Sequence, residues 1–303
     1  MPPDEGGGME RVMAKKEKER QKRKKKEKEP EYIMSPVHRP MLNYKVYYMK
    51  SFERVIYAMI CFGAGAFVGY LFYGGLFKDQ YGNSTNLTYF CNLFIAVIVG
   101  AFGLWFIFPM IKESLLNKRR KLLRQQFSDM LEALSTALNA GRNVNDSFKS
   151  LYSDMKMQYG KDAYITTEIA EILRGVENNI PIEDMLLSFG QRSGIYDIEN
   201  FAKVFYVAFR KGGNLRDIIH STHQVIKDKT EVELEINAIV STNRMEQNIM
   251  IVLPIFLVGI IKMTSPEFAA NFATATGVFS TTFAVVCFVI AYKVGQKILN
   301  IKL

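Results

Sequence analysis

The stretch 55–77, VIYAMICFGAGAFVGYLFYGGLF, decides the fold because it runs for 23 residues without a charged side chain. A helix of this length crosses a hydrocarbon core of about 30 Å. A second run without charge covers residues 92–111, and two more cover 249–261 and 277–292. The sequence therefore predicts a membrane protein with paired spans on either side of a long charged stretch.

The third run is the weakest of the four. Its uncharged core has only 13 residues and contains Pro254. A run this short is also compatible with a buried core helix or a re-entrant hairpin. We favour a span, because Met245, Gln247 and Asn248 can extend the run through the membrane interface.

Lysine and arginine next to a span mark its cytoplasmic side. They crowd the segments 112–124 and 293–302, whereas the connectors between paired runs hold one each, Lys78 and Lys262. We therefore expect a multi-pass protein of the cytoplasmic (inner) membrane, with both termini and the central stretch in the cytoplasm.

Charge and hydropathy divide the chain into four expected parts. Residues 1–54 form a basic tail and juxtamembrane segment, 55–111 two spans, 112–245 a cytosolic domain, and 246–303 two spans with a short cytosolic end. Residues 1–54 hold 15 Lys and Arg against 9 Asp and Glu within a chain of net charge +9.

The segment 11–28 of the tail is lysine-rich and nearly free of apolar residues, which predicts disorder. Without interleaved aromatic residues it favours contact with anionic membrane lipids over nucleic acid, so we expect no nucleic-acid partner. Several aromatic residues then approach the first span, as is typical of a membrane interface. They are Tyr32, Tyr44, Tyr47, Tyr48 and Phe52.

The central stretch predicts helices throughout, because its apolar residues recur at three- and four-residue spacing and Pro181 is its only proline. The expected helices cover 113–140, 144–157, 164–177, 181–192, 197–210 and 214–245. The predicted fold class is all-α: a polytopic membrane protein with four transmembrane helices and a cytosolic six-helix bundle.

A short pattern occurs three times in this stretch: VNDSF at 144–148, IEDML at 182–186 and LRDII at 215–219. Each copy follows a helix breaker and places an aspartate in the first helical turn, where the helix dipole favours negative charge. The expected structural turn residues are Gly141, Pro181, Gly212 and Gly213.

No set of residues with catalytic spacing is apparent. Residues 211–214, KGGN, lack the spacing of a phosphate-binding loop, and His220 with His223 supply too few ligands for zinc. Cys61 and Cys287 fall within apolar runs and Cys91 borders one, and all three are expected to be small buried apolar side chains. We predict no catalytic, cofactor-binding or metal site, and no enzyme.

The four runs also lack acidic and basic side chains, which argues against a transporter. In the first run, Gly63, Gly65 and Gly69 indicate close packing between transmembrane helices.

Three segments together resemble the type II secretion system F domain. They are QFSDMLEALSTALNAG at 126–141, NIPI at 179–182 and FRKGGNL at 209–215. The order of two spans, one such domain and two spans is similar to the inner-membrane platform proteins of tight-adherence (Tad) type IV pili. The resemblance covers about residues 95–303; the lysine-rich tail 1–30 departs from the family pattern.

This resemblance implies a platform that acts as the assembly scaffold of a pilus or secretion machine. The implied partners are a hexameric secretion ATPase, pilin subunits, a second platform paralogue and membrane lipids, in a homo- or hetero-oligomer. The alternative is a membrane signalling adaptor or sensor with a helical relay. Its outer connectors, 78–88 and 262–276, are too short for an ordinary ligand-binding domain.

A platform needs a cytosolic surface for its partner, and the turns farthest from the membrane are the natural place. A helix from Lys112 to Gly141 extends about 40 Å at 1.5 Å per residue. The hypothetical partner-interaction residues at that end are Arg142, Asp146, Arg210, Lys211, Arg216 and Asp217. The other interpretation, ordinary solvated turn charges, has at least equal weight.

Overall fold

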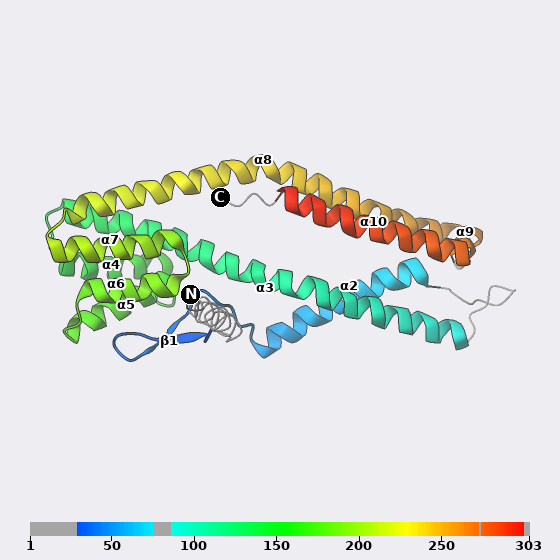
Figure 1. Cartoon of the computed structure of the whole chain (residues 1–303), viewed down its shortest axis with the longest axis horizontal. Helices are drawn as coiled ribbons and strands as arrows, with labels where there is room; N and C mark the ends of the chain where they lie inside the picture. The colour runs from blue at the N-terminus through cyan, green and yellow to red at the C-terminus, as the bar shows by residue number, and fades with distance from the viewer. Residues whose placement is uncertain (1–28, 75–85, 273, 300–303) are drawn as a thin grey trace, which may run out of the picture. The chain divides into compact units, whose positions relative to one another are not determined.

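The computed structural model describes residues 29–74, 86–272 and 274–299, and most of them are helical (Figure 1). The strands are β1 (Tyr32–Met34) and β2 (Pro40–Leu42). The helices are α2 (Ser51–Tyr73), α3 (Asn86–Asn139), α4 (Val144–Tyr159), α5 (Tyr164–Glu177), α6 (Ile182–Ser193), α7 (Tyr196–Lys211), α8 (Leu215–Thr264), α9 (Pro266–Phe272) and α10 (Ala275–Leu299).

The chain divides into two compact units. We call the first the module; its described residues are 29–48, 119–130 and 137–215. We call the second the span unit; it contains residues 49–118, 131–136 and 216–299, apart from the undescribed positions. The long helices α3 and α8 each contribute residues to the span unit, and α3 also supplies the segment 119–130 of the module.

In the module, α4 packs on α5, α5 on α6, and α6 on α7. Aromatic rings fill the core: the Phe127 ring of α3 meets Phe201 of α7 edge-on at 5.5 Å between centroids, and Phe189 of α6 at 6.2 Å. All three side chains are almost wholly buried. Burying such rings removes large apolar areas from water, which is the main stabilising contribution to a small helical unit.

Helix type and position follow the sequence closely. The prediction of an all-α protein with four candidate spans is confirmed. The helix expected at 164–177 has those bounds, and the one expected at 181–192 is Ile182–Ser193. The six-helix arrangement of the cytosolic part stays a prediction.

Four helices are long and apolar enough to cross a membrane: α2, α3, α8 and α10. The weak third run lies inside α8, which continues through Pro254 to Thr264 without a break. Residues 245–264 therefore form a continuous helical stretch of about 30 Å at 1.5 Å per residue. This continuity favours a span over a re-entrant hairpin.

Within the span unit, polar side chains join helices that are distant in sequence. Lys262 Nζ of α8 donates to the carbonyl oxygens of Phe72 at 3.1 Å and Gly74 at 3.4 Å, at the C-terminal end of α2. Carbonyl groups at a helix end lack intrahelical donors, and a lysine placed there satisfies them. Tyr73 of α2 and Thr282 of α10 share a hydroxyl hydrogen bond of 2.9 Å.

The two strands were not predicted. They pair antiparallel, with Tyr32 opposite Leu42 and Met34 opposite Pro40. His38 in the turn has a φ of 58°. Residues 29–48 thus form a folded hairpin segment in the module, which we call the N-terminal hairpin. The lysine-rich segment 11–28 lies outside the described residues, so its predicted disorder stays a prediction.

Candidate functional site

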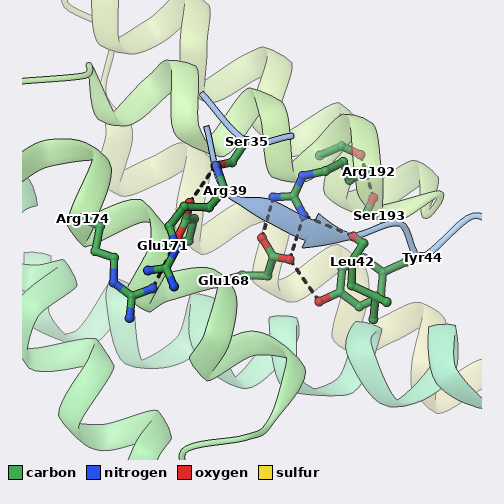
Figure 2. Close-up of polar contacts among 10 residues, drawn as sticks. Ser35, Arg39, Leu42, Tyr44, Glu168, Glu171, Arg174, Arg192 and Ser193 are labelled. Carbon is green, nitrogen blue, oxygen red and sulfur yellow. Dashed lines mark hydrogen bonds and ion pairs between the residues drawn. The ribbon is translucent and has the colours of Figure 1, made fainter. Parts of the chain in front are cut away.

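The N-terminal hairpin is held to the helices of the module by a buried cluster of charged and hydroxyl side chains (Figure 2). At its centre, Arg192 at the end of α6 donates two hydrogen bonds to Glu168 of α5. The Nη1–Oε1 distance is 2.9 Å and the Nη2–Oε2 distance is 2.7 Å. The Arg192 and Glu168 side chains are 4 % and 1 % exposed. A two-fold contact of this kind fixes both the distance and the orientation of the two groups.

The hairpin completes this ion pair. The Tyr44 hydroxyl donates to Glu168 Oε1 at 3.0 Å, and Arg192 Nη1 also donates to the Leu42 carbonyl at 3.3 Å. The Tyr44 backbone N–H donates to the Arg192 carbonyl at 3.0 Å. The Tyr44 side chain is almost fully buried, with its ring edge-on to Tyr164 at 5.7 Å. Both carboxylate oxygens of Glu168, both terminal nitrogens of Arg192 and the Tyr44 hydroxyl are therefore hydrogen-bonded, whereas Arg192 Nε has no partner.

A second buried carboxylate lies one helical turn further along α5. Glu171 accepts a hydrogen bond of 2.7 Å from the Ser35 hydroxyl in the hairpin turn. On its other side it pairs with Arg174, whose Nη1 lies 3.3 Å from Oε2. Residues three apart on a helix share a face, so Glu168 and Glu171 present two acceptors to the same hairpin.

Two arginines of α3 hold the far end of the hairpin. Arg120 donates from Nε to the Tyr44 carbonyl at 3.1 Å and from Nη2 to the Lys45 carbonyl at 3.0 Å. Arg119 donates to the Val46 carbonyl at 3.5 Å, and its guanidinium lies 4.3 Å from the centre of the Tyr47 ring. The hairpin thus contacts α3, α5 and α6.

The electrostatics of the cluster follow from burial and pairing. Burial raises the pKa of the Tyr44 phenol well above its usual 10, and the neighbouring Glu168 carboxylate raises it further. Burial alone would lower the pKa of Arg192, but the hydrogen bond and charge of Glu168 outweigh it and the pKa is raised. Tyr44 is therefore held as a neutral donor beside a charged arginine.

This arrangement binds a chain segment; it does not present reacting groups to a cavity. Glu168 and Glu171 are engaged by the hairpin and are shielded from solvent. Across residues 29–74, 86–272 and 274–299, no group of three His, Cys, Asp or Glu side chains lies close enough to hold a metal ion.

The predicted partner-interaction residues separate into two kinds. Arg210 is committed within the module: it lies 3.3 Å from Glu183 and 3.5 Å from Asp184, and its guanidinium covers the Tyr206 ring at 4.4 Å. The hydrogen bond that Arg210 donates to the Glu183 carboxylate raises the pKa of Arg210. Arg210 therefore ties α7 to the start of α6.

Asp146 also has a local role. Its backbone N–H is accepted by the Asn143 side chain at 2.8 Å, which caps α4, and its carboxylate accepts from Asn143 Nδ2 at 2.6 Å. Arg142 and Lys211 are exposed, as are Arg216 and Asp217 at the start of α8. A partner role for these exposed charges stays a prediction.

The helices α3, α5 and α7 end at left-handed residues with a common hydrogen-bond pattern. Gly141, Asn179 and Gly212 have φ values of 82°, 58° and 74°. In each case the next residue donates its N–H back to the carbonyl five positions earlier: Arg142 to Ala137, Ile180 to Gly175, and Gly213 to Ala208. This is the hydrogen bond of the Schellman motif, which satisfies carbonyls left over at a helix end.

The expected turn residues are thus placed as follows. Pro181 precedes α6 as its N-cap, and Gly141 and Gly212 adopt the left-handed conformation. Gly213 does not have a positive φ. A Cβ on Gly213 would lie 3.0 Å from Ala208 Cβ, so its constraint is close packing.

The glycines of the first span lie differently from one another. A Cβ on Gly65 would come within 2.9 Å of the Val99 carbonyl oxygen of α3, and one on Gly69 within 3.0 Å of Val99 Cβ. A Cβ on Gly63 would meet nothing within 4 Å. The close approach of α2 to α3 therefore involves Gly65 and Gly69, and their role in assembly stays a prediction.

Sequence reasoning missed the residues that hold the hairpin. Tyr44 was expected at the membrane interface, but its ring is buried in the module. Glu168 and Glu171 were not singled out from the sequence. They lie beside Ile165, Ile169 and Ile172 on an amphipathic helix, where a carboxylate is ordinarily solvated.

The comparisons address the module and the helix that follows it. Residues 130–262 match the model of the family "Type II secretion system (T2SS), protein F". The match begins in α3 within the segment that carried the resemblance and ends in α8. It supports the type II secretion system F family for that part of the chain, a family of membrane platform proteins in secretion and pilus assembly that are not enzymes. No curated protein and no solved structure matches the chain.

Proposed function

We propose that this chain is the inner-membrane platform of a Tad-type pilus or a related type II secretion machine. The observation that carries the proposal is the T2SS protein F match at 130–262, set among four helices able to cross a membrane. In this role the chain is an assembly scaffold that couples a cytosolic secretion ATPase to pilin extraction and fibre assembly.

The orientation in this proposal has both termini and the module in the cytoplasm. The clusters of lysine and arginine beside the spans support it. The module then faces the compartment that contains the ATPase. The exposed Arg142 and Lys211 are candidates for that contact, whereas Arg210 is engaged by α6.

The chain supplies no hydrolysis in this scheme. ATP turnover belongs to the hexameric ATPase, and the platform passes its movement to pilins in the bilayer. A second platform paralogue and further copies of this chain complete the assembly. The signalling-adaptor alternative is not favoured by the family match.

The test is co-purification of the tagged full chain, in mild detergent, with the secretion ATPase and pilin encoded by the same organism. We expect both to be retained, and we expect deletion of the gene to abolish surface fibres or secretion until it is restored. A chain that retains neither partner, in cells whose fibres and secretion survive the deletion, would refute the platform function.

A further inference from the structure

We propose that the N-terminal hairpin is a strap that couples the module to the first span, so that α2 follows movements of the module. Three observations carry this inference: the hairpin is attached to three helices, its hydrogen bonds to Glu168 and Glu171 are buried, and only two residues separate it from α2. The use of this coupling by a pilus machine rests on the proposed function, whereas the coupling itself does not.

The strap is attached along its length. Its turn is held at Ser35 by Glu171, and the end of its second strand at Leu42 by Arg192. Tyr44, after that strand, is held by Glu168, and the end of the strap by Arg119 and Arg120. Because these partners belong to α5, α6 and α3, the strap cannot leave without opening contacts to all three helices.

Water cannot easily replace the hairpin as the hydrogen-bond partner of the buried carboxylates. Removing Tyr44 from Glu168 takes a donor from a carboxylate that is 1 % exposed, and a buried charge that loses a hydrogen bond is strongly destabilised. The strap also packs closely at Gly194, where an added Cβ would lie 2.8 Å from Lys45 Cγ and 3.3 Å from Lys45 Cα.

The connection to the span is short. Tyr48 is the last residue that clusters with the module and α2 begins at Ser51, so only Met49 and Lys50 lie between them. Two residues reach at most about 7 Å when fully extended. The start of α2 is further fixed by Glu53, which accepts from the Lys50 backbone N–H at 3.3 Å. A larger displacement of the strap must therefore move α2 or unwind it.

The first test asks whether the buried contacts hold the strap, by hydrogen exchange on the full chain in mild detergent. Glu168→Gln weakens the pair with Arg192, and Gly194→Leu pushes a side chain against Lys45. Gly212→Leu is the matched control, since Gly212 has a similar left-handed backbone with nothing within 4 Å of a Cβ. We expect the amides of Asn43 and Tyr44 to exchange at least tenfold faster in the first two variants than in the control.

The second test measures coupling. Spin labels at Val55→Cys in α2 and Ser153→Cys in α4, with the three native cysteines replaced by alanine, report the spread of distances between span and module. We expect a narrow distribution in the parent and in Gly212→Leu, and one at least twice as broad in Glu168→Gln and Gly194→Leu.

The outcomes are decisive without a working pilus. Equal exchange in Gly194→Leu, Glu168→Gln and the control shows that the buried contacts do not hold the strap. Fast exchange with an unchanged distance distribution shows that the coupling does not run through it. Either result overturns the strap and leaves the platform function standing. If the parent chain shows a narrow distance distribution but does not bind the ATPase, the platform function is overturned and the strap stands.

Discussion

Glu168 and Arg192, 24 positions apart, form a buried ion pair with two hydrogen bonds, and Tyr44 of the N-terminal hairpin donates a further hydrogen bond to Glu168 Oε1. The pair joins the middle of α5 to the end of α6. Because neither charge reaches solvent, each depends on the other and on the hairpin for its hydrogen bonds.

Removing one partner of this pair should destabilise the protein strongly. We expect Arg192→Leu to lower the free energy of unfolding by about 3–5 kcal/mol, because it leaves the Glu168 carboxylate buried and unpaired. The double variant Glu168→Leu with Arg192→Leu should recover much of that loss, because no charge is then stranded. Thermal unfolding of the full chain in detergent measures both, and a double variant no more stable than Arg192→Leu would contradict this account.

The stability of the protein should fall at alkaline pH partly through Tyr44. Its folded-state pKa is raised above 10, so the native state keeps a proton that the unfolded state loses. The stabilisation is fully present below about pH 10 and is lost as the pH rises through the folded pKa. We expect the melting temperature of Tyr44→Phe to fall less steeply than that of the parent between about pH 9 and pH 12.

A second tyrosine contributes to the same pH range. Burial, followed by its hydrogen bond to Asp129, raises the pKa of Tyr159 to about 12. Its contribution remains in Tyr44→Phe and should disappear in the double variant with Tyr159→Phe. Parallel melting curves for parent and Tyr44→Phe across this range would show that Tyr44 is not held as described.

The turn before α6 offers a stabilising substitution. Asn179 is left-handed with a φ of 58°, a conformation that costs a residue with a side chain about 1–2 kcal/mol, less for asparagine. Glycine relieves this strain, but it also gives the unfolded chain more conformational freedom, which lowers the stability of the folded state by about 0.4–1 kcal/mol. We expect Asn179→Gly to stabilise by about 0.5 kcal/mol and Asn179→Ala to destabilise by about 1 kcal/mol. If chemical denaturation shows Asn179→Ala to be more stable than Asn179→Gly, the backbone at Asn179 is not strained as described.

The orientation can be tested by labelling intact cells with an impermeant thiol reagent. In a background without the native cysteines, we expect Thr274→Cys between α9 and α10 to be labelled and Ser153→Cys in α4 to be protected. Both residues are exposed, so both should react once the membrane is permeabilised. Labelling of Ser153→Cys before permeabilisation would reverse the proposed topology.

The role of the exposed turn residues Arg142 and Lys211 in ATPase binding can be tested against two other lysines of the module. We expect Arg142→Glu with Lys211→Glu to leave the melting temperature nearly unchanged and to weaken ATPase binding about tenfold at low salt, mainly through the association rate. The control, Lys156→Glu with Lys161→Glu, changes the same charge near the other end of α4. Equal binding by the two double variants would place the docking surface elsewhere.

Local sequence signals specified the helices because each signal and its effect lie within a few residues. The breakers at Gly141, Pro181 and Gly212 act on the turn they occupy, and the 3.6-residue pattern acts on its own helix. Which of Gly212 and Gly213 adopts the left-handed conformation could not be predicted. Two adjacent glycines carry the same propensity, and only the packing of Ala208 against the second distinguishes them.

The buried cluster could not be predicted because its partners are distant in the chain. Tyr44 among other tyrosines before a span has the composition of a membrane interface, and only its contact with Glu168, 124 positions later, gives it another role. A carboxylate on a helix is solvated in most proteins. Its burial here depends on a hairpin that three-residue strands signal very weakly.

The attachment of the hairpin imposes an order on biosynthesis. Leu42 and its partner Arg192 are 150 positions apart. At a translation rate of about 5–20 residues per second, roughly 8–30 s separate the synthesis of the two. During that interval the first two spans can already be entering the membrane while the hairpin still lacks its partner Arg192. A nascent chain of this protein therefore passes through a period in which chaperones and proteases have access to a segment that the finished molecule conceals.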